Sequence, residues 1–133
     1  MTTERLVVIG GDAAGMSAAS QARRMRADLE VVAFERSAYT SYSACGLPYY
    51  VGGVVADVQP LIARSPGEFL KRGIQAHVRH EVESIDLSNR RIRVRRIDDG
   101  AVLWETFDQL VIATGAVPLR PSRSGGDARG VYD

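Results

Sequence analysis

The 133-residue chain has one cysteine, almost no net charge and no long hydrophobic run, and each shortage excludes something. With no second cysteine, Cys45 cannot form an internal disulfide, so any disulfide that it makes is with another molecule. A formal net charge of +1 provides no field that would attract nucleic acid or an acidic membrane to the whole surface. The apolar run at residues 6–9 is too short for a signal peptide or a membrane span, and a lone cysteine without an export signal is typical of the reducing cytoplasm.

The rest of the composition is ordinary for a globular protein, with 45% hydrophobic and 25% charged residues, which argues against disorder. A chain of this length forms one domain or part of one. The arginine pairs at residues 90–91 and 95–96 alternate with apolar residues, so we interpret them as the solvated face of a strand. We therefore expect a small-molecule partner, with no nucleic acid, no membrane and no metal site.

The first 35 residues predict a β-α-β unit of a parallel sheet. The apolar runs at residues 6–9 and 31–34 are typical of strands buried on both faces. Between them a helix begins at Ala13, and its stripe of small residues would allow close packing against a sheet. Arginines gather at the predicted carboxyl end of this helix, where the helix dipole favours cations.

Beyond residue 36, the spacing of apolar residues along the chain changes several times. Residues 37–53 predict an ordered loop with one turn of helix, and Ser65, Pro66 and Glu68 predict a helix with a capping box that ends at Gly73. Period-two segments at 75–78, 82–86, 91–96 and 102–106 predict an antiparallel meander, after which the apolar run 110–113 rejoins the parallel sheet. The fold class is α/β: a Rossmann-like unit (1–117) with an inserted meander, followed by a linker (118–133).

The turn between the first strand and the helix carries a dinucleotide signature, Gly-Gly-Asp-Ala-Ala-Gly at residues 10–15. It meets the G-x-G-x-x-G rule at both ends but has Asp12 in the middle, a carboxylate that we expect to point outward or to cap the helix. Glu35 follows Gly15 by twenty residues, at the end of the second strand, where a carboxylate can accept both hydroxyls of an adenosine ribose. The alternative is that the glycines only permit a tight turn and that Glu35 is a solvated strand end.

Two further motifs stand at loops. Thr114-Gly115 follows the last apolar strand, at the edge where parallel sheets bind ligands. Cys45 lies in the run Thr-Ser-Tyr-Ser-Ala-Cys-Gly-Leu-Pro-Tyr-Tyr (40–50), among small, hydroxyl and aromatic residues that suit a redox thiol. The alternative is an inert, buried cysteine, as free cysteines often are.

Taken in order, these motifs resemble the FAD-dependent pyridine nucleotide-disulfide oxidoreductases, over residues 6–118. The lone cysteine is similar to that of the single-cysteine branch: coenzyme A-disulfide reductases, NADH oxidases, NADH peroxidases and persulfide reductases. The two-cysteine branch has Cys-x-x-x-x-Cys, and Cys45 has no partner at that spacing.

The resemblance implies FAD as cofactor, NAD(P)H as electron donor, and Cys45 as the catalytic cysteine that passes electrons to a disulfide, persulfide, peroxide or oxygen. The implied cofactor-binding residues are Gly10, Gly11, Ala14, Gly15, Glu35, Arg36, Val82, Thr114 and Gly115. The implied substrate-binding residues, at positions that contact coenzyme A in the family, are Ser17, Gln21, Arg24 and Ser41. Ala44 and Gly73 replace an asparagine and a lysine of the coenzyme A enzymes, so two polar contacts to that substrate are missing.

The resemblance also implies a homodimeric enzyme whose flavin domain is discontinuous, so we expect this chain to be its amino-terminal FAD segment and inactive alone. The competing hypothesis is a non-catalytic, nucleotide-binding redox sensor in which Cys45 is structural.

Overall fold

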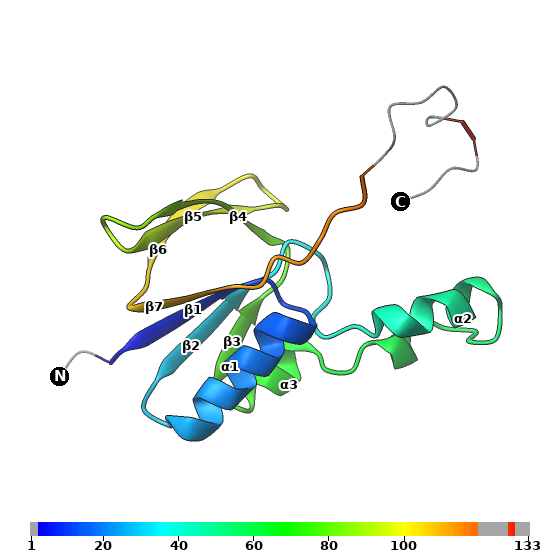
Figure 1. The fold of residues 1–133 in the computed structure, drawn as a ribbon, viewed down its shortest axis with the longest axis horizontal. Helices are drawn as coiled ribbons and strands as arrows, with labels where there is room; N and C mark the ends of the chain where they lie inside the picture. The colour runs from blue at the N-terminus through cyan, green and yellow to red at the C-terminus, as the bar shows by residue number, and fades with distance from the viewer. Residues whose placement is uncertain (1–2, 120–127, 130–133) are drawn as a thin grey trace.

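The computed structural model describes residues 3–119 and 128–129, which form three layers (Figure 1). The central layer is a parallel sheet in the order β3-β2-β1-β7. Its strands are β1 (Arg5–Ile9), β2 (Glu30–Phe34), β3 (Ile74–His77) and β7 (Gln109–Ile112). Helices α1 (Ala13–Met25) and α3 (Pro66–Leu70) cover one face, and an antiparallel sheet of β4 (His80–Asp86), β5 (Arg91–Arg96) and β6 (Val102–Thr106) covers the other.

The two faces of the central sheet bury separate cores, because side chains alternate along each strand. Leu6 and Val8 of β1 pack with Phe69 and Ile74 on the helix side. Val7 and Ile9 pack with Ile92, Val94 and Phe107 on the meander side. Since both faces of β1 and β2 are covered, both strands are apolar after their first residue, as the sequence predicted for 6–9 and 31–34.

The predicted helices are confirmed. In α1, the Arg23 guanidinium donates to the carbonyls of Ala27 and Leu29, which closes the turn leading into β2. In α3, the Ser65 side chain accepts from the Glu68 N–H and the Glu68 carboxylate accepts from the Ser65 N–H at 2.8 Å, a complete capping box. The helix ends at Leu70, and Gly73, with φ of +77°, lies in the turn that follows.

One strand was assigned to the wrong sheet. Residues 75–78 were predicted to open the antiparallel meander, but β3 pairs in parallel with β2, with Val31 opposite Ile74 and Phe34 opposite His77. The meander therefore has three strands, β4 to β6. The sequence misleads because β3 lies at the edge of the parallel sheet with Gln75 and His77 exposed, so it alternates like a half-buried antiparallel strand. The later return to the parallel sheet is confirmed, since β7 pairs with β1.

The arginines of β5 face outward, as predicted, but they are ion-paired. Arg91 lies 3.0 Å from Asp86, and Arg93 and Arg95 pair with Glu83 of the neighbouring strand β4. The hydrogen bond from Arg95 holds the pKa of Glu83 below its usual range. The Arg91 guanidinium also stacks 4.3 Å from the centre of the Trp104 ring.

Most of the predicted linker lies outside the described residues. Within the part of the chain that the structure describes, we find no helix both long enough and apolar enough to traverse a bilayer.

Candidate functional site

The turn between β1 and α1 requires glycine at both ends. Gly10 has φ of +108°, and a Cβ there would lie 2.1 Å from the Ala113 carbonyl oxygen. A Cβ on Gly15 would lie 1.9 Å from the Gly10 carbonyl oxygen, so the first turn of α1 sits directly on the loop. The first N–H of α1 with an acceptor in the helix is that of Met16, which donates to Asp12 at 2.9 Å. The N–H groups of residues 13–15 precede it and form a site suited to an anion.

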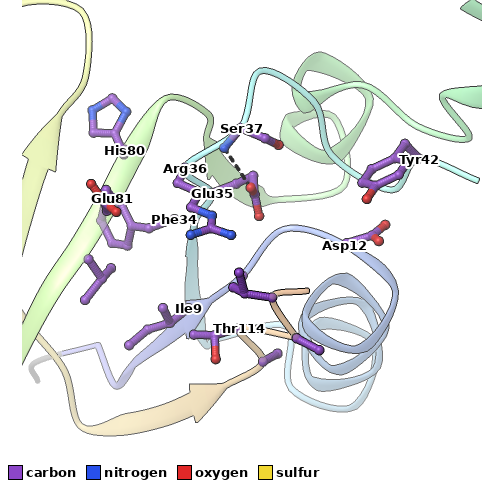
Figure 2. A pocket seen from close by; sticks show the side chains of 16 residues that line it. Ile9, Asp12, Phe34, Glu35, Arg36, Ser37, Tyr42, His80, Glu81 and Thr114 are labelled. Carbon is purple, nitrogen blue, oxygen red and sulfur yellow. Dashed lines mark hydrogen bonds between the residues drawn. The ribbon is translucent and has the colours of Figure 1, made fainter. Parts of the chain in front are cut away.

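Glu35 is held at the end of β2 by two backbone donors. Its Oε2 accepts from the Gly11 N–H at 2.6 Å, and its Oε1 accepts from the Ser37 N–H at 2.7 Å (Figure 2). Gly11 fits because a Cβ there would lie 2.6 Å from the Cβ of Glu35. Each carboxylate oxygen keeps a further lone pair, so Glu35 is oriented and can still accept from a ligand.

Gly10, Asp12 and Glu35 border one open cleft of about 460 Å³ at the carboxyl ends of β1, β2 and β7 (Figure 2). Its lining includes six of the nine predicted cofactor residues: Gly10, Glu35, Arg36, Val82, Thr114 and Gly115. The other three do not line it: Gly11 donates to Glu35, Gly15 is buried under the turn, and Ala14 is exposed on α1. Residues far apart in the sequence are thus brought together at one cleft.

The cleft fits the adenosine and pyrophosphate half of a dinucleotide. Free helix N–H groups and a glycine turn without Cβ atoms suit a pyrophosphate, and an oriented carboxylate suits a ribose diol. Apolar side chains of Ile9, Phe34 and Val82 line the same cleft and suit a planar ring.

A second cleft, of about 430 Å³, lies beside α1 and holds most of the predicted substrate residues. Ser17, Arg24 and Ser41 line it, together with Arg64, which the sequence did not single out. Gln21 does not line it; its carboxamide oxygen accepts from the Arg24 guanidinium. Two guanidinium groups on one cleft suit an anionic ligand.

Cys45 is exposed and lines neither cleft. It lies in the short helix η1 (Ala44–Gly46), which continues into α2 (Leu47–Val51), and neither helix contains a buried residue. We call residues 44–60 the Cys45 excursion, which extends away from the body of the molecule (Figure 1).

The excursion is attached at its base. The Ser43 N–H donates to Leu61 at 2.6 Å, and the Ala63 N–H donates to Ser41 at 2.8 Å. The buried Thr40 hydroxyl donates to the Arg64 carbonyl at 2.8 Å. Both ends of the excursion are therefore fixed next to the second cleft. Cys45 follows Ser43, which lines that cleft, by two residues.

Asp12 behaves differently from our expectation. It occupies the N-cap position of α1, but its side chain makes no capping hydrogen bond. Its Oδ1 is buried without a hydrogen-bond partner among the described residues. The carboxylate is therefore not a cap.

Sequence reasoning also missed an aromatic group beside the first cleft. The rings of Phe34 and His77 stack at 5.3 Å, and the His80 ring lies 5.4 Å from His77. Burial, followed by the charge of His80, lowers the pKa of His77. The signal in the sequence is the pair of histidines, His77 and His80, around the β3–β4 turn.

Known proteins resemble this chain along most of its length. It is 40% identical over 128 residues to the NAD(P)H sulfur oxidoreductase (CoA-dependent) of Pyrococcus abyssi, covering 96% of this chain and 28% of that protein. It is 31% identical over 113 residues to a coenzyme A disulfide reductase of Staphylococcus epidermidis, covering 84% of this chain and 26% of that protein. Among solved structures, the NAD-dependent persulfide reductase from A. fulgidus is 40% identical, with a TM-score of 0.89 over 95% of this chain and 24% of that one.

The chain thus spans about a quarter of the length of these relatives. The family model described as pyridine nucleotide-disulphide oxidoreductase matches residues 4–132, which contain both clefts and Cys45. This chain belongs to the pyridine nucleotide-disulphide oxidoreductase family.

Proposed function

We propose that this chain is the amino-terminal FAD segment of an NAD(P)H-dependent oxidoreductase whose electrons leave through Cys45 to a disulfide, persulfide, peroxide or oxygen. The observation that carries the proposal is the first cleft, where the Gly10 turn, Glu35 and Thr114-Gly115 meet at the carboxyl edge of the sheet. We use the word holoenzyme for this chain together with the other segments that its relatives have. In it, residues 1–117 form the first part of the FAD domain and 118–133 lead to the NAD(P)H domain.

The chain's own residues have separate tasks in this proposal. The turn at residues 10–15 binds the pyrophosphate, Glu35 binds the adenosine ribose, and Arg36 and Val82 border the adenine. When bound, FAD supplies two-electron transfer between NAD(P)H and sulfur. The exposure of Cys45 supports a redox role, because a structural cysteine of a nucleotide sensor would be expected to be buried.

With a disulfide acceptor, the Cys45 thiolate attacks one sulfur, the substrate S–S bond breaks and the other half leaves as a thiolate. Two electrons then return Cys45 from the mixed disulfide to the thiolate and release the second half. The second cleft, with Ser17, Arg24 and Ser41, is the proposed seat of the acceptor, and its guanidinium groups favour an acceptor that carries phosphate, such as coenzyme A disulfide. We place the holoenzyme in the cytoplasm as a homodimer, from the lone cysteine and from the family.

The cofactor assignment is tested by Glu35→Ala in the holoenzyme. Loss of the ribose contacts should weaken FAD binding by about 1–3 kcal/mol, measured by titration of the apoprotein with FAD and by flavin absorbance after gel filtration. The control is Glu30→Ala, a carboxylate at the other end of β2 that pairs with Arg5 at 3.3 Å. Unchanged FAD affinity in Glu35→Ala would refute the assignment.

The role of Cys45 is tested by Cys45→Ser in the holoenzyme. The variant should keep its flavin and still be reduced by NAD(P)H, because hydride arrival does not involve the thiol. Disulfide reduction should fall by about a thousandfold or more, because the nucleophile is gone, while direct reaction with oxygen continues. Disulfide reduction near the wild-type rate would make the cysteine structural.

A further inference from the structure

Two residues border both clefts. Of the described residues, Asp12 and Tyr42 line the cofactor cleft and also the second cleft. They come from different elements, the N-cap of α1 and the loop before η1. They therefore form the partition between the place of the cofactor and the place proposed for the acceptor.

The Asp12 carboxylate lacks the partner that its position would normally provide. At an N-cap, an aspartate usually accepts from an N–H in the first turn of the helix. Asp12 does not, and its Oδ1 is buried without a hydrogen-bond partner among the described residues. A buried acceptor without a donor is costly, so a donor is expected beside it.

Tyr42 can provide that donor. Figure 2 shows the Tyr42 hydroxyl and the Asp12 carboxylate turned toward one another at one side of the cleft. The backbones beside them are already joined, since the Ser41 N–H donates to the Gly11 carbonyl at 2.9 Å. Ser41 has φ of +47°, an unusual conformation for a residue with a side chain, which indicates that the surroundings fix this bend.

We infer that the Tyr42 hydroxyl donates to the Asp12 carboxylate in the cofactor-loaded holoenzyme, and that this pair positions Cys45 against the cofactor. The inference rests on the proposed function and deepens it. Tyr42 precedes Cys45 by three residues, on a segment that also contacts Leu61 through the Ser43 N–H and through Gly46. The pair is thus a side-chain link between the turn that holds the pyrophosphate and the turn that holds the thiol. Both are positioning residues.

The test compares four holoenzyme variants with wild type: Tyr42→Phe, Asp12→Ala, the double variant and Asp12→Asn. Asp12→Ala should not weaken α1, because the side chain does not cap it. Asp12→Asn keeps an acceptor oxygen for the tyrosine and should restore most of the wild-type behaviour. Tyr39→Phe is the matched control, since Tyr39 is an exposed tyrosine of the same loop that lines neither cleft.

The first readout is steady-state reduction of dithiobis(nitrobenzoate) by NADH. Tyr42→Phe and Asp12→Ala should each lower kcat about tenfold, the effect of losing one hydrogen bond to a charged group, with KM for the disulfide within about twofold. The double variant should be no slower than either single variant, because both remove the same link. FAD content and the reduction of ferricyanide, which bypasses the thiol, are measured for each variant, and the fall in disulfide reduction should exceed any fall in either of them.

The second readout does not depend on activity. After reduction and desalting, Cys45 should be alkylated by iodoacetamide at least about threefold faster in both single variants than in wild type. The double variant should react no faster than the single variants. Additive effects in the double variant, or single variants that match Tyr39→Phe, would overturn the inference. Failure of the proposed function is a different result, read from wild type alone: no bound FAD and no disulfide reduction.

Discussion

The cofactor turn and the Cys45 excursion are built in opposite ways. The turn at residues 10–15 joins two elements of the buried core and has so little space that a single added carbon at Gly10 would meet a backbone oxygen at 2.1 Å. The excursion at 44–60 has exposed apolar side chains, among them Val51 at 84% and Val54 at 77% exposure, and its Gly53 has no atom within 4 Å of an added Cβ.

The difference teaches where pre-organisation comes from. The cofactor turn is held by the core of this chain, so its shape does not depend on a ligand. The excursion is held by a few hydrogen bonds at its base. The position of Cys45 therefore depends on those bonds and on whatever segment covers the excursion in the holoenzyme. A tightly packed glycine turn and a loosely held cysteine thus lie next to each other in the same chain.

The largest effect should come from Gly10→Ala compared with Gly53→Ala. Both glycines have positive φ, so both variants are strained, but only Gly10 also meets backbone atoms. We expect Gly10→Ala to cost about 4 kcal/mol or more and Gly53→Ala about 1 kcal/mol, measured by hydrogen exchange of the β1 and β2 amides in the holoenzyme. Equal costs would mean that the turn yields as easily as the excursion.

A smaller effect separates the two regions by burial alone. Ile74 is 1% exposed and Val51 is 84% exposed. Ile74→Ala should lower the free energy of unfolding of the sheet by about 2–5 kcal/mol, because it leaves a cavity, whereas Val51→Ala should change it by less than about 0.5 kcal/mol. The same exchange measurement reports both. A Val51→Ala cost near that of Ile74→Ala would show that the excursion is covered in the holoenzyme.

Thr40→Val tests the base of the excursion. The change keeps the shape of the buried side chain but removes the hydrogen bond to the Arg64 carbonyl, at a cost of about 1–2 kcal/mol. Limited proteolysis should then cut within residues 44–60 faster than in wild type. Ser37→Ala, which changes an exposed hydroxyl of the preceding loop, is the control and should leave the cleavage rate unchanged.

The smallest effect concerns His77 and pH. Its pKa is lowered in the folded protein, so as pH falls through the ordinary value of 6.5 the unfolded chain takes up a proton more readily than the folded one. The free energy of unfolding therefore decreases as pH is lowered. His77→Gln should lose less of it than wild type when pH is lowered from about 7.5 to about 5.5. Urea unfolding midpoints at the two pH values measure the difference, with Gln75→Ala on the same strand as control. Equal losses in His77→Gln and wild type would contradict the shift.

Local rules predicted the local structure. The capping box at Ser65, the continuous apolar strands and the glycine turn each depend on neighbouring residues, and all are present. The membership of β3 in the parallel sheet depends instead on which edge the chain reaches after α3, and alternation of exposed and buried residues does not encode that.

The same limit applies to the site. Glu35 and Thr114 were found because their motifs have fixed places at strand ends. The stacking of Phe34 with His77, and the pairing that we infer for Asp12 with Tyr42, join segments that carry no common motif. Gln21 was carried over from a family position, but in this chain its side chain is engaged by Arg24 on the helix surface.

The order of strands in the central sheet has a consequence for how the chain folds. One neighbour of β1 is β2, which follows in the same local unit, but the other is β7, whose Leu110 pairs with Val7 from about a hundred residues away. A ribosome takes on the order of ten seconds to synthesise the intervening chain. During that time the edge of β1 that pairs with β7 has no partner strand, and a meander folded as a local unit shortens the span that has to close before β7 pairs. Folding of the cofactor turn, whose Gly10 packs against Ala113, therefore has to wait for the last strand.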